Sequence, residues 1–281
     1  MPIKIDWKRV DPKTDFKYED PRSSGSHDGF SVRVQCKDPN TGNYVPLLFQ
    51  GPKMRIPFGF EGRNTPGGIK YYSPMSFPSV RQDGNGVYVC SPGNEDALAF
   101  LQFMQKIDEL NLEKATQECK KWFKKEMSPT VLEEFYYKNL STPKDAEKYS
   151  PTLSSKLIHN GTEFKTEFWN TKRERIEYED IPAGSTVIPI ISTRGLWFAG
   201  KSFGMSIQVV QMMVFETDRF NGCAIDFGDP RAEEENDTEA DQPLTIDLDE
   251  ADESKNTDQP ASKRRRTNTR ASTAVSEEFN M

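Results

Sequence analysis

Residues 196–215 read LWFAGKSFGMSIQVVQMMVF. The glycines of the GKSFG segment are typical of a turn, and the apolar run that follows them is typical of a β-strand. We therefore expect a short strand over residues 196–199 and a long strand over residues 205–215. A further apolar run over residues 186–192 predicts another strand just before this pair.

The body of the chain also opens with a strand pattern. Residues 30–36 alternate strictly, so that their four apolar residues share one face of a half-buried strand. Residues 38–43 (DPNTGN) are typical of a turn, and residues 44–49 (YVPLLF) supply the second arm of a hairpin. Pro46 within that arm indicates an edge strand or a bulge.

The middle of the chain holds weaker signals and one strong one. Residues 51–86 are dense in glycine, proline and aromatic residues, which indicates irregular structure, and residues 87–90 indicate a short strand. Farther on, the segment His159-Asn160-Gly161 separates apolar runs at residues 153–158 and 162–169. Because Asn-Gly between two such runs favours a tight turn, we expect them to form a second hairpin.

Helical spacing appears between these two regions. The stretch SPGN at residues 91–94 is typical of a helix start, with its serine or its asparagine as the N-cap. We expect the helix to break near Asn111, to resume over residues 112–127 and to end at Pro129, with a further turn or two over residues 131–137. The apolar residues recur on one face of these helices, so their simplest role is to cover the core.

This order of elements predicts a mainly β fold with a helical insertion. The best match is an OB-fold-like antiparallel barrel whose helices plug one end. We expect an N-terminal arm over residues 1–28 and an OB-like nucleic-acid-binding domain over residues 29–228, with the helical insertion at about 94–138. Residues 229–281 form the third part, a tail.

The tail carries most of the net charge. The whole chain has a formal net charge of −7, and residues 229–281 hold 15 acidic and 7 basic residues. Residues 1–228 hold 29 acidic and 30 basic residues, so the acidic balance does not exclude a nucleic acid as the partner of the body. The tail has too few apolar residues to offset the entropy of ordering, and we expect this acidic C-terminal tail to be disordered.

Patterns for catalysis and metal binding are weak. The chain has no P-loop run, no GxGxxG and no GxSxG motif. Its four cysteines and two histidines match no zinc spacing, and their simplest state is reduced and structural. Asp226 and Asp229 are a weak candidate pair for a metal. We therefore expect no enzyme activity, no cofactor and no metal.

Targeting signals are weak as well. No stretch approaches 18 consecutive apolar residues, and the first residues, MPIKIDWKRVDPK, lack the apolar core of a signal peptide. We therefore expect no membrane partner and a protein that is not secreted.

Three groups of residues combine positive charge with aromatic rings. Bases present π faces whatever their sequence, and lysine or arginine beside the rings neutralises phosphates. The largest group spans residues 53–72, and smaller groups surround Trp169 and Trp197; for each ring, packing in the core is the alternative. The candidate nucleic-acid-binding residues are Lys53, Arg55, Phe58, Phe60, Arg63, Lys70, Tyr71, Tyr72, Lys165, Trp169, Lys172, Arg173, Arg175, Arg194, Trp197 and Lys201.

The tail holds two further motifs. A basic cluster at residues 263–270, led by Lys263, Arg264, Arg265 and Arg266, is of the kind that nuclear import receptors read. Folding back onto the acidic run and direct DNA binding are the alternatives. Near the end, Glu277, Glu278 and Phe279 combine anionic groups with one ring, as a nucleic acid does. We expect the tail to compete for the nucleic-acid groove and, once released, to recruit replication or recombination proteins.

Two segments also carry a resemblance to a known family. The early YVPLLF (residues 44–49) and the late RGLWFAGKSFGMSIQVVQMMVF (residues 194–215) resemble the single-stranded DNA-binding proteins of nucleocytoplasmic large DNA viruses, of the algal-virus and swine-fever-virus type. They are distantly similar to podophage single-stranded DNA-binding proteins. The resemblance spans roughly residues 30–220. It implies an OB fold with a helical insertion and, in the phage branch, an acidic tail ending in an aromatic residue.

Residues and resemblance together predict a protein that binds single-stranded DNA without sequence preference. We expect it to serve viral DNA replication, recombination or repair, in the host nucleus or at a viral replication site. Homo-oligomers and a nuclear import receptor are possible further partners. The alternative is a structural protein of the virion or nucleus, or an acidic chaperone of basic proteins.

Overall fold

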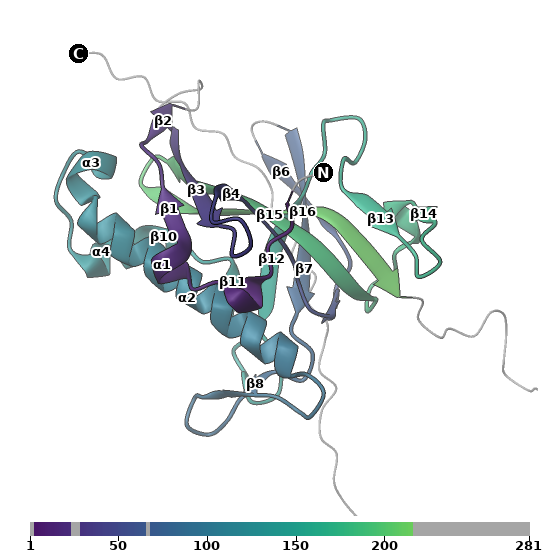
Figure 1. Cartoon of the computed structure of the whole chain (residues 1–281). Helices are drawn as coiled ribbons and strands as arrows, with labels where there is room; N and C mark the ends of the chain where they lie inside the picture. The colour runs from purple at the N-terminus through teal and green to yellow at the C-terminus, as the bar shows by residue number, and fades with distance from the viewer. Residues whose placement is uncertain (1–2, 24–28, 66–67, 216–281) are drawn as a thin grey trace, which may run out of the picture. The chain divides into compact units, whose positions relative to one another are not determined.

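The computed structural model describes residues 3–23, 29–65 and 68–215 (Figure 1). Within these residues the prediction of a mainly β fold with a helical insertion is confirmed. The acidic tail, the basic cluster at residues 263–270, the Glu277–Phe279 ending and the Asp226/Asp229 pair all lie outside the described residues.

Two long antiparallel strands, β15 (Thr186–Ala199) and β16 (Ser202–Phe215), form the central hairpin. Their burial alternates along most of their length because one side of the hairpin faces the core. The sequence predicted two separate strands at residues 186–192 and 196–199. The structure joins them into one strand with irregularities at Ile190/Ile191 and Thr193/Gly195.

Gly195 explains how β15 passes through the second irregularity. Its φ is +121°, and a Cβ added there would lie 2.1 Å from the carbonyl oxygen of Val32 on β3 (Phe30–Lys37). Only glycine has both the conformational freedom and the small size that this close approach requires. The edge of β15 can therefore take β3 here and β4 (Tyr44–Gln50) just before it.

Five strands close a ring of pairings. The order is β15, β5 (Met54–Arg55), β7 (Gly68–Ser76), β12 (Thr152–Leu157), β16 and back to β15. The closure is short in places, since β5 meets β7 at one residue pair and β12 meets β16 at two. The expected barrel was antiparallel throughout, but the β12–β16 pair is parallel.

The predicted hairpin of residues 30–49 is confirmed as β3 and β4. Two short N-terminal strands, β1 (Phe16–Tyr18) and β2 (Arg22–Ser23), extend it along β3. The N-terminal segment also contains the short helices η1 (Trp7–Arg9) and α1 (Pro12–Asp15). Trp7 is buried, and its indole N–H donates to the Gln50 carbonyl oxygen at 3.0 Å, so this segment packs onto the body.

Residues 51–86 are more regular than the sequence predicts. Strand β6 (Glu61–Thr65) pairs along its whole length with β7. The glycine and proline residues of β7 hid the alternation typical of a strand. In the structure, Lys70 and Tyr72 project to one side of β7, and Ser73 and Met75 project to the other, buried side. A second, two-stranded sheet contains β8 (Arg81–Gln82) and β9 (Tyr88–Val89).

The predicted hairpin of residues 153–169 is confirmed only at its turn, because its two arms pair with other strands beyond it. Strand β12 pairs with β7, β16 and β11 (Leu140–Ser141), whereas β13 (Glu167–Trp169) pairs with β16 and β14 (Arg175–Ile176). At the turn, an isolated antiparallel bridge joins His159 to Phe164, and the Lys165 N–H donates to the Ile158 carbonyl at 2.7 Å. Successive segments of one β16 edge take β12 and then β13, and the Thr166 hydroxyl fastens the link between them by donating to the Val209 carbonyl at 2.7 Å.

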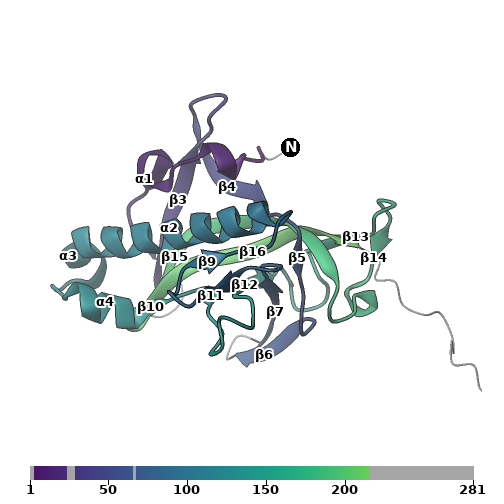
Figure 2. The same cartoon turned by 90° about the horizontal axis from the view of Figure 1, so that it is seen from below.

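The helical insertion contains α2 (Glu95–Gln117), α3 (Cys119–Phe123) and α4 (Pro129–Phe135), followed by β10 (Tyr136–Tyr137). Figure 2 shows α2 lying across the face of the hairpin formed by β15 and β16. The predicted break at Asn111 is wrong, because α2 is continuous there and the Asn111 side chain is buried. Its amide accepts from the Tyr18 hydroxyl at 2.7 Å and donates to the Tyr136 hydroxyl at 3.0 Å.

This buried polar network ties the N-terminal segment, α2 and β10 together. The Tyr136 hydroxyl donates to the Asp108 carboxylate at 2.6 Å. Burial raises the pKa of Asp108 to about 6, against the opposing effect of this hydrogen bond. Asn111, a polar residue in the middle of a helix, therefore links packed elements through buried hydrogen bonds. One of these elements is β10, which pairs with β16.

Candidate nucleic-acid interface

A groove lies on the outward side of the sheet and is lined by residues of β3, β6, β7, β10, β12, β15 and β16. We call it the sheet groove; its volume is about 630 Å³. Its basic and aromatic lining includes Arg63, Lys70, Tyr72, Tyr137, Lys156 and Trp197. The sheet groove therefore joins the predicted group at residues 53–72 to the predicted group around Trp197.

Strand register explains why these side chains meet. Directly paired residues of neighbouring strands project to the same side of a sheet. One row crosses four strands at the middle of the hairpin and runs Tyr72, Lys156, Gln208 and Ser192. None of the four is buried, so the row faces outward.

Aromatic side chains occupy the end of the groove nearest the hairpin turn. Trp197 and Tyr137 pair with Gly204 from opposite sides, and their ring centroids are 6.2 Å apart. A Cβ at Gly204 would lie 3.2 Å from the Trp197 indole and 2.8 Å from the Tyr137 carbonyl oxygen. The missing side chain at Gly204 thus leaves room for both neighbours, with Trp197 half-buried and Tyr137 exposed.

Uncompensated positive charge lines the middle of the groove. Lys70, Lys156 and the adjoining Arg194 form no ion pair among the residues that the structure describes. Burial lowers the pKa of Lys156, and the positive charges of Lys70 and Arg194 lower it further. The three positive groups are therefore close enough to interact electrostatically. Such a cluster of cations is suited to bind anions.

Arg63 differs from these three cations. It forms a 2.8 Å salt bridge with Glu61, and this hydrogen-bonded pair raises the pKa of its guanidinium. The guanidinium also lies 4.7 Å from the centroid of the Tyr72 ring. Arg63 therefore positions the Tyr72 ring as well as contributing charge.

A second hollow of about 370 Å³ contains Trp169 and Arg173 from the predicted group around Trp169. Arg173 lies at the β13–β14 turn with φ +64°, and the Asn170 side chain closes this turn by accepting from the N–H groups of Lys172 and Glu174. Lys172 and Arg175 are exposed on the same turn. Lys165 lies nearby in sequence and pairs with Glu163.

The remaining predicted residues do not join the sheet groove. Phe60 and Tyr71 pack in an aromatic cluster, with centroid distances of 5.5 Å to Phe168 and 4.8 Å to Phe164 respectively. Tyr71 is separated from the groove because it projects from β7 opposite to Tyr72. Phe58 is 74% exposed and does not line the sheet groove.

The basic residues Lys53, Arg55 and Lys201 also lie apart from the groove. The Lys53 ammonium lies 4.8 Å from the Phe215 ring centroid, and Arg55 donates to the Gly184 carbonyl at 3.2 Å. Lys201 lies beside Lys125 in a small hollow next to the Phe198 ring.

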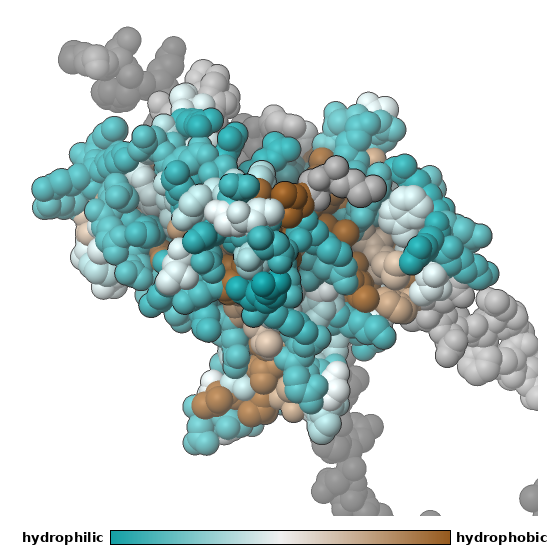
Figure 3. Space-filling view, in the orientation of Figure 1, coloured by the Kyte–Doolittle hydropathy of each residue, from teal (hydrophilic) through white to brown (hydrophobic). Residues whose placement is uncertain are grey.

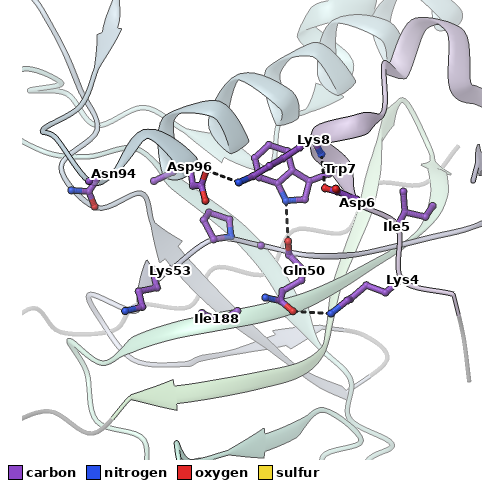
Figure 4. Close-up of a pocket in the computed structure, with 14 residues that line it drawn as sticks. Lys4, Ile5, Asp6, Trp7, Lys8, Gln50, Lys53, Asn94, Asp96 and Ile188 are labelled. Carbon is purple, nitrogen blue, oxygen red and sulfur yellow. Dashed lines mark hydrogen bonds and ion pairs between the residues drawn. The ribbon is translucent and has the colours of Figure 1, made fainter. Parts of the chain in front are cut away.

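Lys53 also lines a hollow of about 580 Å³ between the N-terminal segment and the start of α2 (Figure 4). Other lysines there already have partners, since Lys8 forms a 2.7 Å salt bridge with Asp96 and Lys4 donates to the Gln50 side chain at 2.9 Å. This hollow is therefore less suited to bind anions than the sheet groove.

Sequence reasoning missed two groove residues. Lys156 occupies an outward position of a strand that was predicted at residues 153–158, so the alternation could have identified it. Tyr137 was assigned to a helical turn, and the brief β10 strand that carries it gives no local signal.

Within the described ranges, no group of histidine, cysteine and acidic residues could hold a metal ion, and no helix is long and apolar enough to cross a membrane.

Comparisons with known proteins match the chain to a family model and to solved structures. Residues 94–226 match the model of a family of unknown function, DUF5871. No curated protein matches the sequence.

Solved structures resemble the chain weakly. The single-stranded DNA-binding protein gp2.5 of bacteriophage T7 is 13% identical, with a TM-score of 0.39 over 72% of this chain and 100% of that chain. The single-stranded DNA-binding protein of bacteriophage Enc34 is 12% identical, with a TM-score of 0.36 over 75% of this chain and 96% of that chain. The Enc34 protein in complex with single-stranded DNA is 13% identical, with a TM-score of 0.35 over 72% of this chain and 98% of that chain.

Proposed function

We propose that this protein binds single-stranded DNA in the sheet groove, without sequence preference and without catalysing a reaction. The observation that carries the proposal is the joint placement, on one outward face, of two half-buried aromatic side chains and three cations that form no ion pair within the described part of the chain. Phosphates would contact Lys70, Lys156 and Arg194, and bases would stack on Tyr72 and Trp197. Stacking stabilises each base by about 1–3 kcal/mol and depends little on base identity.

The architecture is consistent with this role. A partly closed ring of five strands with an exposed face, which we interpret as an OB-type barrel, is a common scaffold for single strands. We propose that the protein acts in viral DNA replication, recombination or repair, in the host nucleus or at a viral replication site.

We further propose that the acidic tail regulates the groove. Residues 229–281 carry a net charge of −8 and end near Glu277, Glu278 and Phe279, so they offer both anions and a ring to the same cationic surface. DNA would displace the tail, which would then be free to recruit replication or recombination proteins. The basic cluster at residues 263–270 would serve nuclear import.

A titration with oligo-dT, followed by tryptophan emission, tests the proposal. Trp7 and Trp122 are buried whereas Trp169 and Trp197 are half-buried, so quenching reports mainly on surface rings. We expect saturable quenching that Trp197→Phe reduces, and tighter binding by a chain truncated after residue 228 than by the full chain. Absence of binding by both chains would contradict DNA binding, and equal affinities would contradict tail competition only.

A further inference from the structure

We propose that a single strand bound in the sheet groove continues along the β15–β16 hairpin and places another base in the hollow beside Trp169. This inference rests on the proposed function and extends it by a second base-binding subsite. The hollow beside Trp169 and the sheet groove share no lining residue, so the second subsite is separate from the first.

Strand register places both hollows on the same side of the hairpin. Trp169 pairs with Met213, and Met213 pairs with Ile188, so these three side chains form a row across β13, β16 and β15. None of the three is buried, as in the Tyr72 row. Gly204, Gln208 and Met213 therefore lie on the outward side of β16. Each of them belongs to one of three successive cross-strand rows.

The distance between the rows suits one continuous ligand. Met213 is nine positions after Gly204, which corresponds to about 30 Å at ~3.3 Å per residue. A stacked strand advances about 3.4 Å per nucleotide, so about nine nucleotides would span the rows, and fewer if the strand is extended. This length lies within the range of about 4–16 nucleotides that OB folds occupy.

The hollow beside Trp169 has the chemistry of a base site. Its floor is formed by the apolar side chains of Ile188, Ile190 and Met213, and Trp169 supplies a half-buried indole. Figure 3 shows apolar surface at this end of β16, bordered by hydrophilic side chains. An uncharged planar ring can pack against these apolar side chains. A ligand that is only a charged group would gain no favourable contact with them.

Polar groups at the rim fit the edges of a base and its phosphate. Arg173 lines the hollow and takes no ion-pair partner among the described residues, so it can contact a phosphate. Gln50 and Gln211 lie on opposite sides of Ile190 in a single cross-strand row. The Gln211 amide donates to the Glu167 carboxylate at 2.6 Å, so this neighbouring carboxylate already has a hydrogen-bond donor.

A length series of oligonucleotides tests the inference. Full-length wild type, Trp169→Leu and Trp197→Leu would be titrated with dT4, dT8 and dT12. We expect Trp169→Leu to weaken binding of dT12 by about 5- to 100-fold and to leave dT4 within twofold of wild type, whereas Trp197→Leu weakens binding at every length. The control Tyr149→Leu removes another exposed ring, 55% accessible, that lines neither hollow, and should change no affinity.

Cross-linking gives a readout that does not depend on any variant folding. Wild-type protein would be irradiated with dT12 carrying one 5-iododeoxyuridine at a series of positions. We expect labels near one end to cross-link in the sheet groove and labels near the other end to cross-link at Trp169. Cross-links to Trp169 from no position, or an equal effect of Trp169→Leu on dT4 and dT12, would overturn the inference. Failure of wild type to bind any oligonucleotide would instead overturn the proposed function.

Discussion

Replacing Lys70, Lys156 and Arg194 together with alanine is expected to weaken binding of oligo-dT on the order of 100-fold at 50 mM salt. Each phosphate contact on a single strand contributes about 0.7 to the slope of log affinity against log salt concentration. Losing three contacts should therefore reduce that slope by about 2. The three side chains are outward-facing and unpaired among the described residues, so the folded state should persist.

A matched variant separates the groove from the net charge. Lys13, Lys106 and Lys144 are exposed on other parts of the body, and their replacement with alanine removes the same charge. We expect this control to keep the wild-type affinity within about threefold, because long-range attraction is largely screened beyond the Debye length. Equal losses in both triple variants would mean that binding depends on general charge and not on the groove.

Gly195→Ala is expected to destabilise the fold by about 3 kcal/mol or more. The substitution would place a side chain on a residue with φ +121° and only 2.1 Å from the Val32 carbonyl oxygen. Relief would require β3 to separate from β15. Urea unfolding followed by circular dichroism measures the change in the free energy of unfolding.

Gly200 provides the control for this substitution. Its φ is +58°, but a Cβ there would contact nothing within 4 Å. Gly200→Ala should therefore cost only about 1 kcal/mol, the effect of backbone conformation alone. A similar loss for both variants would show that close packing at Gly195 adds little.

Local patterns predicted much of this fold. The alternation of residues 30–36, the turn after it and the helical spacing from residue 95 all depend on neighbours in sequence, and each appears in the structure. Two of the failures share one cause, which is a tertiary contact overriding a local signal. Asn111 lies inside a helix because two tyrosine hydroxyls satisfy its amide. Asn160-Gly161 forms a turn, but its arms do not continue as a hairpin because β16 pairs with both flanking strands.

The candidate site was harder to predict than the fold. Composition identified the basic and aromatic residues, but strand register decides which of them meet. Tyr71 and Tyr72 are adjacent in sequence yet project to opposite sides of β7, so only Tyr72 lines the groove. Lys156 became part of the site because β12 places it directly opposite Tyr72, a pairing that no local pattern reveals.

The acylation rates of individual lysines, with and without bound oligo-dT, test most directly whether the sheet groove holds DNA. The lowered pKa of Lys156 leaves more of its amine unprotonated, so it should react readily in the free protein. On saturation with oligo-dT we expect Lys70 and Lys156 to react several-fold more slowly, while Lys106 and Lys144 keep their rates. Unchanged rates at Lys70 and Lys156 in the presence of bound DNA would contradict the placement of the strand in this groove.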